Sequence, residues 1–270
     1  MNSGERSIPF VKASACGNDF LLIELSALEP CTPAELADLT KRVCDRHNGV
    51  GADGVEWMSP YVACDLEIRL INADGSDAEI SGNGTRCVAA YLCSETKKER
   101  LAIQTGAGLK TCTLVSHHDY EYEFEAEMGE AVVDREVKLM TTRGEVRGIP
   151  VSMGNPHYVI FVPEFPPEWQ RFAAEIQQNT YFQQGVNVEF VKVEDESNLQ
   201  VRFFERGAGE TQSSGTGSCA SAAAAIATAR IASPARIHTL GGLQTVRQEG
   251  RRIYLRGSAR LVCRGELFMS

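Results

Sequence analysis

The sequence predicts an α+β fold made of two related halves, and internal repetition is the main observation behind this prediction. A glycine-rich turn that leads into small apolar residues occurs at residues 81–90 (SGNGTRCVAA) and again at residues 214–223 (SGTGSCASAA), 133 residues later. The pair Gly17-Asn18 returns as Gly154-Asn155 at an offset of 137 residues. A chain of 270 residues is long enough for two domains of about 130 residues each.

The first half mixes helix and strand signals. The segment Thr32-Pro33-Ala34-Glu35 combines an N-cap, a first-turn proline and a glutamate at N3, so a helix should begin here with a capping box and run to about Cys44. The glycine-rich turn at residues 81–84 should open a second helix that ends near Cys93. Apolar runs and alternating apolar and polar side chains predict strands at residues 21–25, 65–72 and 120–128.

The second half repeats this order of elements. A helix is expected over residues 167–178. Residues 219–231 are rich in alanine and predict another helix, whose small side chains let neighbours pack closely around it in a buried, central position. Strands are expected around residue 151 and at residues 158–162, 187–193, 199–204, 253–255 and 260–263.

Composition excludes several classes of function. A formal net charge of −9 and a pI near 5.2 argue against nucleic acid or an anionic membrane as the main partner. Nine cysteines without a Cys-x-x-Cys pair argue against a zinc site and a disulfide framework, and favour free thiols in a reducing cytoplasm. No apolar run approaches the roughly 18 residues that a membrane span needs. We therefore expect a cytoplasmic protein with neither a nucleic-acid nor a membrane partner.

Each glycine-rich turn is a candidate anion site. The start of a helix leaves backbone N–H groups without intrahelical acceptors and carries the positive end of the helix dipole, and glycines let a ligand come close. Gly82 and Asn83 in one copy, and Gly215 and Thr216 in the other, are therefore candidate contacts for a carboxylate or phosphate. The alternative is that both turns are only capped helices, with the preceding serine as N-cap.

Polar residues precede both turns at the same distance. Asn72 lies nine residues before the first turn motif, and Glu205 lies nine residues before the second and is followed by Arg206. Because a guanidinium fork suits a carboxylate, Arg206 with Asn72 and Asn187 is a candidate clamp for a distal carboxylate. The alternative for Glu205-Arg206 is a surface ion pair.

Short motifs from residue 16 to beyond residue 220 follow the order and spacing of one family. They are Cys16-Gly17-Asn18-Asp19-Phe20, Asp45-Arg46-His47-Asn48-Gly49-Val50-Gly51-Ala52-Asp53-Gly54, Asn72-Ala73-Asp74-Gly75-Ser76, Ser81-Gly82-Asn83-Gly84-Thr85-Arg86-Cys87, Gly154-Asn155-Pro156-His157, Gly185-Val186-Asn187-Val188-Glu189-Phe190, Glu205-Arg206-Gly207-Ala208-Gly209-Glu210-Thr211 and Ser214-Gly215-Thr216-Gly217. Through these motifs the chain resembles the diaminopimelate epimerases, the pyridoxal-phosphate-independent racemase and epimerase family of lysine and peptidoglycan precursor synthesis.

The resemblance implies two domains, residues 1–126 and residues 127–258, each a strand-rich, barrel-like sheet around a central helix. It implies that residues 259–270 form a strand that returns to the first domain, and that the active site lies between the domains. The implied reaction interconverts LL- and meso-diaminopimelate by two-base proton transfer at the α-carbon, without cofactor or metal. A homodimer is also implied, although Cys263 stands where family members often carry an interface tyrosine.

The resemblance also assigns roles to particular residues. The two acid–base positions correspond to Ser81 and Ser214, and His157 and Glu205 are the groups that tune them. Substrate contacts are implied at Asn18, Asn72, Gly82, Asn83, Asn155, Asn187, Glu205, Arg206, Gly215 and Thr216.

Both acid–base positions carry serine where the family carries cysteine. A thiol titrates near 8.5, whereas a hydroxyl is far more basic, so direct substitution should lower the rate by orders of magnitude. Serine can still act when a neighbouring base such as His157 or Glu205 takes its proton. Cys87 and Cys219 lie roughly 7–9 Å further along the predicted helices and are expected to be buried packing thiols.

Several interpretations of the two serines stay open. The chain is a serine-based epimerase, a non-catalytic paralogue that binds the amino acid, or an enzyme with a deliberate pair of Cys→Ser changes. A further alternative is another isomerase or a dehydratase of the same fold, which needs only one strong base. Exchange of the α-hydrogen with solvent separates the catalytic interpretations from the binding protein.

Overall fold

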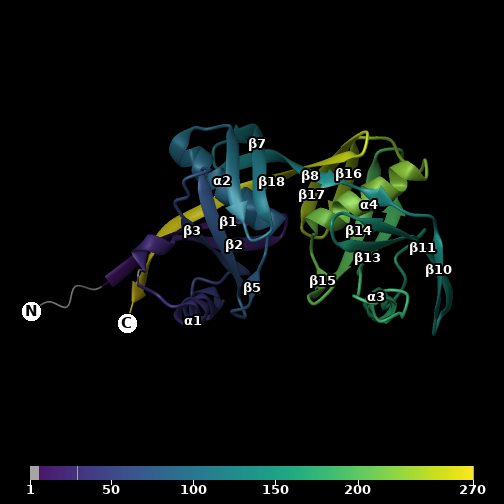
Figure 1. Ribbon diagram of the computed structural model, residues 1–270, viewed down its shortest axis with the longest axis horizontal. Coiled ribbons are helices and arrows are strands. Elements are labelled where there is room, and N and C mark those ends of the chain that lie inside the picture. The colour runs from purple at the N-terminus through teal and green to yellow at the C-terminus, as the bar shows by residue number, and fades with distance from the viewer. Residues whose placement is uncertain (1–5, 29, 270) are drawn as a thin grey trace, which may run out of the picture. The chain divides into compact units, whose positions relative to one another are not determined.

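The computed structural model describes residues 6–28 and 30–269. Residues 1–5, 29 and 270 lie outside the described residues, and with them parts of the expected first domain (residues 1–126) and of the expected returning strand (residues 259–270). The chain divides into two compact units (Figure 1). Unit 1 contains the residues up to 126 together with those from 258 onward, and unit 2 contains residues 127–257.

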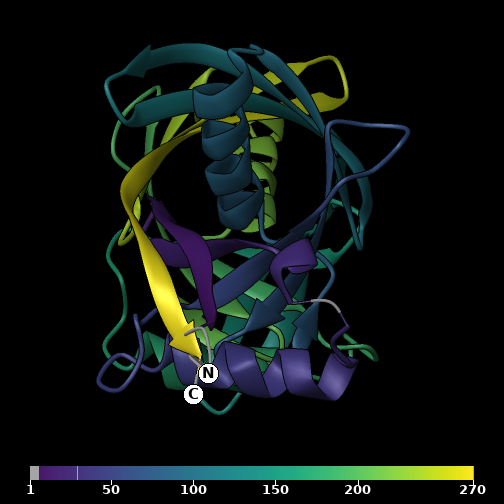
Figure 2. The ribbon, with the colours of Figure 1, turned by 90° about the vertical axis from the view of Figure 1, so that its left-hand side faces the viewer.

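Unit 1 is a closed barrel with a helix inside it. Within the described residues its eight strands follow each other as β1 (Arg6–Ala15), β2 (Asn18–Glu24), β3 (Gly54–Ser59), β4 (Leu66–Asn72), β6 (Arg100–Thr105), β7 (Gly108–His118), β8 (Glu121–Glu130) and β18 (Arg252–Met269), and β18 pairs with β1 to close the ring. The short strand β5 (Asp77–Ala78) pairs with β4, and the 3₁₀ turn η1 (Leu25–Ala27) follows β2. Helix α2 (Gly82–Thr96) lies inside the ring of strands (Figure 2).

Unit 2 repeats this plan around helix α4 (Gly215–Ala227). Its sheet is made of β9 (Val132–Val133), β11 (Gly144–Ser152), β12 (Pro156–Phe161), β13 (Asn187–Val193), β14 (Asn198–Glu205), β16 (Ala235–Thr239), β17 (Gly242–Glu249) and the first residues of β18. Two short strands extend it, because β10 (Val137–Thr141) pairs with β11 and β15 (Gly209–Thr211) pairs with β14.

Each unit also has a helix on the outer face of its sheet. In unit 1, α1 (Pro33–Cys44) packs Leu36 and Leu39 into a core cluster with Val55 and Trp57 of β3. In unit 2, α3 (Trp169–Gln177) packs Ile176 into the corresponding cluster with residues of β12 and β13. Strands β3 and β13 therefore have a helix on both faces, and every residue of Gly54–Met58 is buried.

The expected α+β class with two sheet-and-helix halves is confirmed. The capping box at the start of α1 is also confirmed, because Thr32 Oγ1 accepts the N–H of Glu35 at 3.3 Å while Glu35 Oε2 accepts the N–H of Thr32 at 2.8 Å. Among the described residues, none of the helices has the length and apolar character of a membrane span.

One expectation about the second half is wrong in its bounds. The helix expected over residues 219–231 begins at Gly215 and ends at Ala227, since Ser214 caps it earlier and Ala229 adopts a left-handed φ of 54° that stops it. The strands expected at residues 253–255 and 260–263 are confirmed, and both are parts of one strand, β18, which contributes to both units.

Candidate active site

Helix α2 begins directly after Ser81 in the interior of unit 1. The Ser81 Oγ accepts a hydrogen bond from the N–H of Gly84 at 3.0 Å, and the hydroxyl of Thr85 donates to the Ser81 carbonyl at 2.8 Å. The serine is thus an N-cap, and the positive end of the helix dipole lies beside its hydroxyl. This is a helix end at which an anion can bind.

A network of amides and one buried arginine supports this end of α2. The Nδ2 of Asn83 donates to Oδ1 of Asn18 at 2.7 Å, and Nδ2 of Asn18 donates to Oδ2 of Asp53 at 2.9 Å. The guanidinium of Arg86, a residue only 2% exposed, donates to Oδ1 of Asn83 and to the Cys16 sulfur. The structure therefore brings the predicted residues Asn18 and Asn83 together and fixes the orientation of both amides.

The start of α4 carries the same cap and, in addition, a carboxylate. Ser214 Oγ accepts the N–H of Gly217 at 3.2 Å and donates to Glu205 Oε2 at 3.0 Å. The second oxygen of Glu205 accepts from Thr211 Oγ1 at 2.6 Å. Strand β14 ends at Glu205 and thereby places the carboxylate beside the helix start. A carboxylate in hydrogen-bond contact with a hydroxyl has the geometry of a general base for that hydroxyl.

His157 and Glu189 form a buried pair next to this turn. Nδ1 of His157 lies 2.7 Å from Oε1 of Glu189, and neither side chain is exposed to solvent. Burial raises the pKa of Glu189, and the charge and hydrogen bond of His157 partly offset that rise. Nε2 of His157 lies 3.0 Å from Oδ1 of Asn155, whose Nδ2 donates to Thr216 Oγ1 at 3.3 Å. His157 therefore reaches the helix end through Asn155 and Thr216.

The residues of the predicted carboxylate clamp belong to both units, and two of them are neighbours within unit 2. In unit 2, Oδ1 of Asn187 accepts the backbone N–H of Arg206 at 2.9 Å, so these two residues are neighbours. The exposed Arg206 side chain donates from Nη1 to the carbonyl of Gln184 at 2.7 Å. Asn72 belongs to unit 1, where its Nδ2 donates to Ser76 Oγ at 3.0 Å.

Sequence reasoning missed two buried glutamates, Glu56 and Glu189, each of which is 0% exposed. Glu56 lies on β3 and Glu189 on β13, and they contact the first turns of α2 and α4 respectively. A signal for them exists in the sequence, because the segments Val55-Glu56-Trp57 and Val188-Glu189-Phe190 are 133 residues apart, the offset of the two turn motifs. A glutamate inside an apolar run in both copies indicates a shared buried position.

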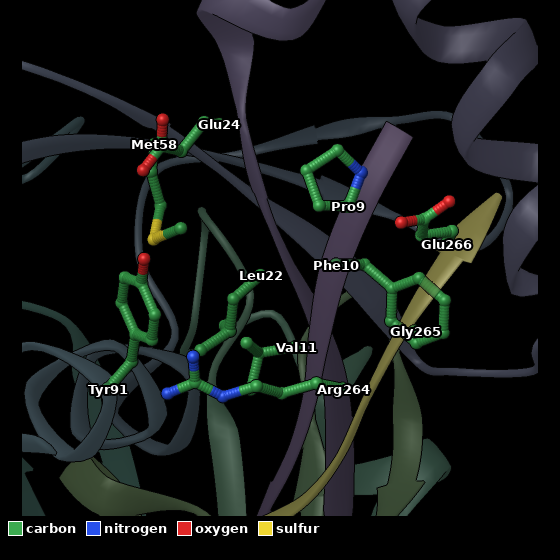
Figure 3. Close-up of a pocket in the computed structure, with 10 residues that line it drawn as sticks. All are labelled: Pro9, Phe10, Val11, Leu22, Glu24, Met58, Tyr91, Arg264, Gly265 and Glu266. Atoms are coloured by element: carbon green, nitrogen blue, oxygen red, sulfur yellow. The ribbon is translucent and has the colours of Figure 1, made fainter. Parts of the chain in front are cut away.

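Two hollows among the described residues are not centred on these helix ends. One of about 360 Å³ in unit 1 is lined by apolar residues such as Leu22 and Met58 together with the polar residues Tyr91, Arg264 and Glu24 (Figure 3). Tyr91 lies ten residues into α2 from its N-cap, which is about 15 Å along the helix axis.

A second hollow, of about 490 Å³, lies in unit 2 and borders the candidate site. Its lining includes Thr211, the residue whose hydroxyl donates to Glu205, together with Glu210 and Leu240. Each unit therefore has a candidate half-site, formed by the polar groups at the start of its inner helix, and the half-site of unit 2 has a hollow beside it.

The fold belongs to a class that includes epimerases and isomerases. A phenazine biosynthesis protein of the PhzF family from Bacillus anthracis superposes with a TM-score of 0.74 at 14% identity, over 97% of this chain and 99% of that chain. A hydroxyproline epimerase from Agrobacterium vitis, solved with bound trans-4-hydroxy-L-proline, superposes with a TM-score of 0.68 at 16% identity, over 97% and 91% of the two chains. At these identities the likeness shows a shared fold.

The chain belongs to the diaminopimelate epimerase family. The model of that family matches residues 10–133 and 149–262. A diaminopimelate epimerase from Pelotomaculum thermopropionicum is 35% identical over 95% of this chain and 98% of its own length. The diaminopimelate epimerase from Caldanaerobacter subterraneus is 34% identical over 96% and 98% of the two chains.

Proposed function

We propose that this protein is a diaminopimelate epimerase homologue that interconverts LL- and meso-diaminopimelate by proton transfer at the α-carbon, without a cofactor. The observation that supports the proposal most is the 3.0 Å hydrogen bond from Ser214 Oγ to Glu205 Oε2 at the start of α4. It gives a hydroxyl at one family acid–base position a carboxylate that can take its proton. The membership of the chain in the family supports the choice of substrate.

Each residue has a definite part in this scheme. Ser214 removes the α-proton while its own proton passes to Glu205, and Ser81 delivers a proton to the α-carbon. Solvent then returns a proton to Ser81 and takes the proton of Glu205, which restores both groups. The helix ends at Gly82 and Gly215 stabilise the negative charge that develops on the α-carboxylate, because their N–H groups are fixed before the reaction. Since a hydroxyl gives up its proton much less readily than a thiol, we expect slow turnover.

Amide and guanidinium groups hold the substrate. Asn18 and Asn155 orient the two turns, through Asn83 and Thr216 respectively. Asn187, Arg206 and Asn72 bind the distal carboxylate, and Arg206 has to leave the Gln184 carbonyl to do so.

The proposal extends to the biological setting. We propose that the protein works in the cytoplasm as a homodimer, in the synthesis of lysine and peptidoglycan precursors. The names of its relatives support the pathway, and size-exclusion chromatography with light scattering tests the dimer.

The test is to incubate the protein with LL-diaminopimelate in D₂O and to follow α-deuterium uptake by NMR. The Ser81→Cys/Ser214→Cys variant runs beside it, and Ser258→Cys, which places an exposed thiol on β18, controls for the new cysteines. Deuterium uptake together with formation of the meso isomer by the unmodified chain supports serine-based epimerisation. No uptake by the unmodified chain, and uptake by the double-cysteine variant, would limit the natural chain to binding. No uptake by either refutes the substrate assignment.

One observation favours a second candidate function. The position nine residues before Ser81 carries Asn72, an amide that cannot act as a base, whereas the equivalent position before Ser214 carries Glu205. Only the unit 2 turn therefore has a carboxylate at this position, which suits another isomerase or a dehydratase that needs one base. Loss of water from a hydroxy amino acid, or an isomer other than meso-diaminopimelate, identifies that function.

A further inference from the structure

Glu56 is a carboxyl group buried against the first turn of α2. It lies on β3 between Leu22 of β2 and Leu70 of β4, and its side chain has no solvent exposure. A methyl group added at Gly84 would lie 1.9 Å from Oε1 of Glu56 and 3.3 Å from Cβ of Ser81. The carboxyl group is therefore in contact with the turn that begins the helix, on the side of the turn away from solvent.

No hydrogen-bonding group among the described residues satisfies this carboxyl group. Both oxygens of Glu56 are buried without a hydrogen-bond partner, and burial raises its pKa to about 8. Glu56 interacts electrostatically with Cys87 on α2, and Cys87 also interacts with Arg86, with Cys16 in the β1–β2 turn and with Asp19 of β2. The guanidinium of Arg86 is directed to Asn83 and Cys16, and burial raises the pKa of Cys87.

The second unit has a carboxyl group in the same place but neutralises it differently. In the parallel pair β12–β13, Val159 lies opposite Glu189 and His157 lies two residues before Val159. In the parallel pair β2–β3, Leu22 lies opposite Glu56, so Phe20 occupies the position that corresponds to His157. The imidazole of His157 forms a hydrogen bond with Glu189, whereas Phe20, at the matching position beside Glu56, has no hydrogen-bonding group in its side chain.

We propose that Glu56 is a positioning residue of the α2 half-site, and that it must be in its neutral acid form for an anionic group to bind at the turn from Ser81 to Gly84. This proposal rests on the proposed function, in that it takes this turn to be a site for a substrate carboxylate. A charged Glu56 would place a second negative charge behind the same N–H groups and oppose binding. Binding therefore takes up one proton from solvent whenever Glu56 is ionised beforehand.

The test is isothermal titration calorimetry of the full-length protein with meso-diaminopimelate. Titrations in two buffers with different ionisation enthalpies give the number of protons taken up at each pH. We expect the dissociation constant to rise by up to about tenfold per pH unit above about pH 8, with proton uptake approaching one. The Glu56→Gln variant, which is neutral at every pH, should lack this contribution while the titration of the ligand's own amines stays the same.

Two controls separate this inference from the proposed function. The Glu56→Leu variant repeats the test without a buried amide, and circular dichroism confirms that both variants fold. Equal proton uptake by the natural protein and both variants overturns the role of Glu56 and leaves the substrate assignment intact. If meso-diaminopimelate does not bind at any pH, the proposed function fails.

A second measurement decides the state of Glu56 without a ligand. In protein labelled with ¹³C at the glutamate carboxyl carbons, the Glu56→Gln variant identifies the resonance of Glu56. Titration of that resonance near the ordinary glutamate value would overturn the inference, whether or not diaminopimelate binds.

Discussion

Nδ1 of His157 and Oε1 of Glu189 are 2.7 Å apart in the interior of unit 2, and this pair determines how the α4 end of the site is ordered. Nε2 of His157 lies 3.0 Å from Oδ1 of Asn155, and Nδ2 of Asn155 donates to Thr216 Oγ1 at 3.3 Å. The imidazole therefore connects the buried carboxyl group of Glu189 to the first turn of α4. A carboxyl group buried at this depth requires such a hydrogen-bonding partner.

We expect His157→Phe to reproduce in unit 2 the arrangement of Glu56 and Phe20. The substitution leaves Glu189 buried without its partner, so its pKa should rise further and the free energy of unfolding should fall by about 3 kcal/mol near neutral pH. Urea denaturation measures this loss. The double variant His157→Phe/Glu189→Leu should recover much of it, and a double variant as unstable as the single one would contradict the explanation.

Glu56 should make the stability of the protein depend on pH. Its pKa of about 8 lies above the ordinary value of 4.5, so the folded protein binds more protons than the unfolded chain between these two values. The contribution of Glu56 to stability is therefore lost progressively as pH rises from about 4.5 to about 8, and is constant above that. Glu56→Leu should remove this slope and stabilise the protein at pH 8 by an amount on the order of a few kcal/mol. Urea midpoints across this range, compared between the two proteins, check the prediction.

Two glycines of the same turn should respond differently to alanine. A methyl group at Gly84 meets Oε1 of Glu56 at 1.9 Å, whereas one at Gly82 finds its nearest atom, Nη1 of Arg86, at 3.9 Å. We expect Gly84→Ala to destabilise the protein by about 1–3 kcal/mol and Gly82→Ala to be neutral or slightly stabilising. Thermal unfolding compares them. Equal effects would show that the carboxyl group of Glu56 does not lie against the turn.

The two N-cap serines should differ in their contributions to stability. Ser81→Ala removes a cap and should cost about 1 kcal/mol. Ser214→Ala removes a cap and also the hydroxyl that donates to Glu205, so we expect a cost of about 2 kcal/mol. Unfolding in urea measures both variants. With Glu205→Gln as the background, the difference between the two serines should shrink.

Features set by neighbours in sequence were predictable. The capping box at Thr32 and Glu35 depends on residues within one helical turn. The repeated motif at Ser81 and Ser214 predicted two related helix starts. The extent of β18 was not predictable, because Gly257 and Ser258 interrupt its apolar pattern and only pairing with other strands continues it.

The site was predictable where it consists of polar residues in turns, and not where it consists of groups inside the sheet. A glutamate in a strand is ordinarily expected on the solvent side of the sheet, as the period of two suggests. Glu56 and Glu189 are buried because β3 and β13 have helices on both faces. This packing belongs to the tertiary structure and is not encoded in the local pattern of either strand. The contact of His157 with Glu189 likewise requires the parallel pairing of β12 with β13.

Strand β18 has a consequence for the order in which the protein matures on the ribosome. The barrel of unit 1 is closed by residues that follow the whole of unit 2 in the chain. It therefore lacks the strand that pairs with β1 until unit 2 has been translated. At about 5–20 residues per second, the roughly 130 intervening residues keep the nascent barrel open for on the order of ten seconds. Unit 1 is thus translated before unit 2, yet its barrel can close only after unit 2 has been made.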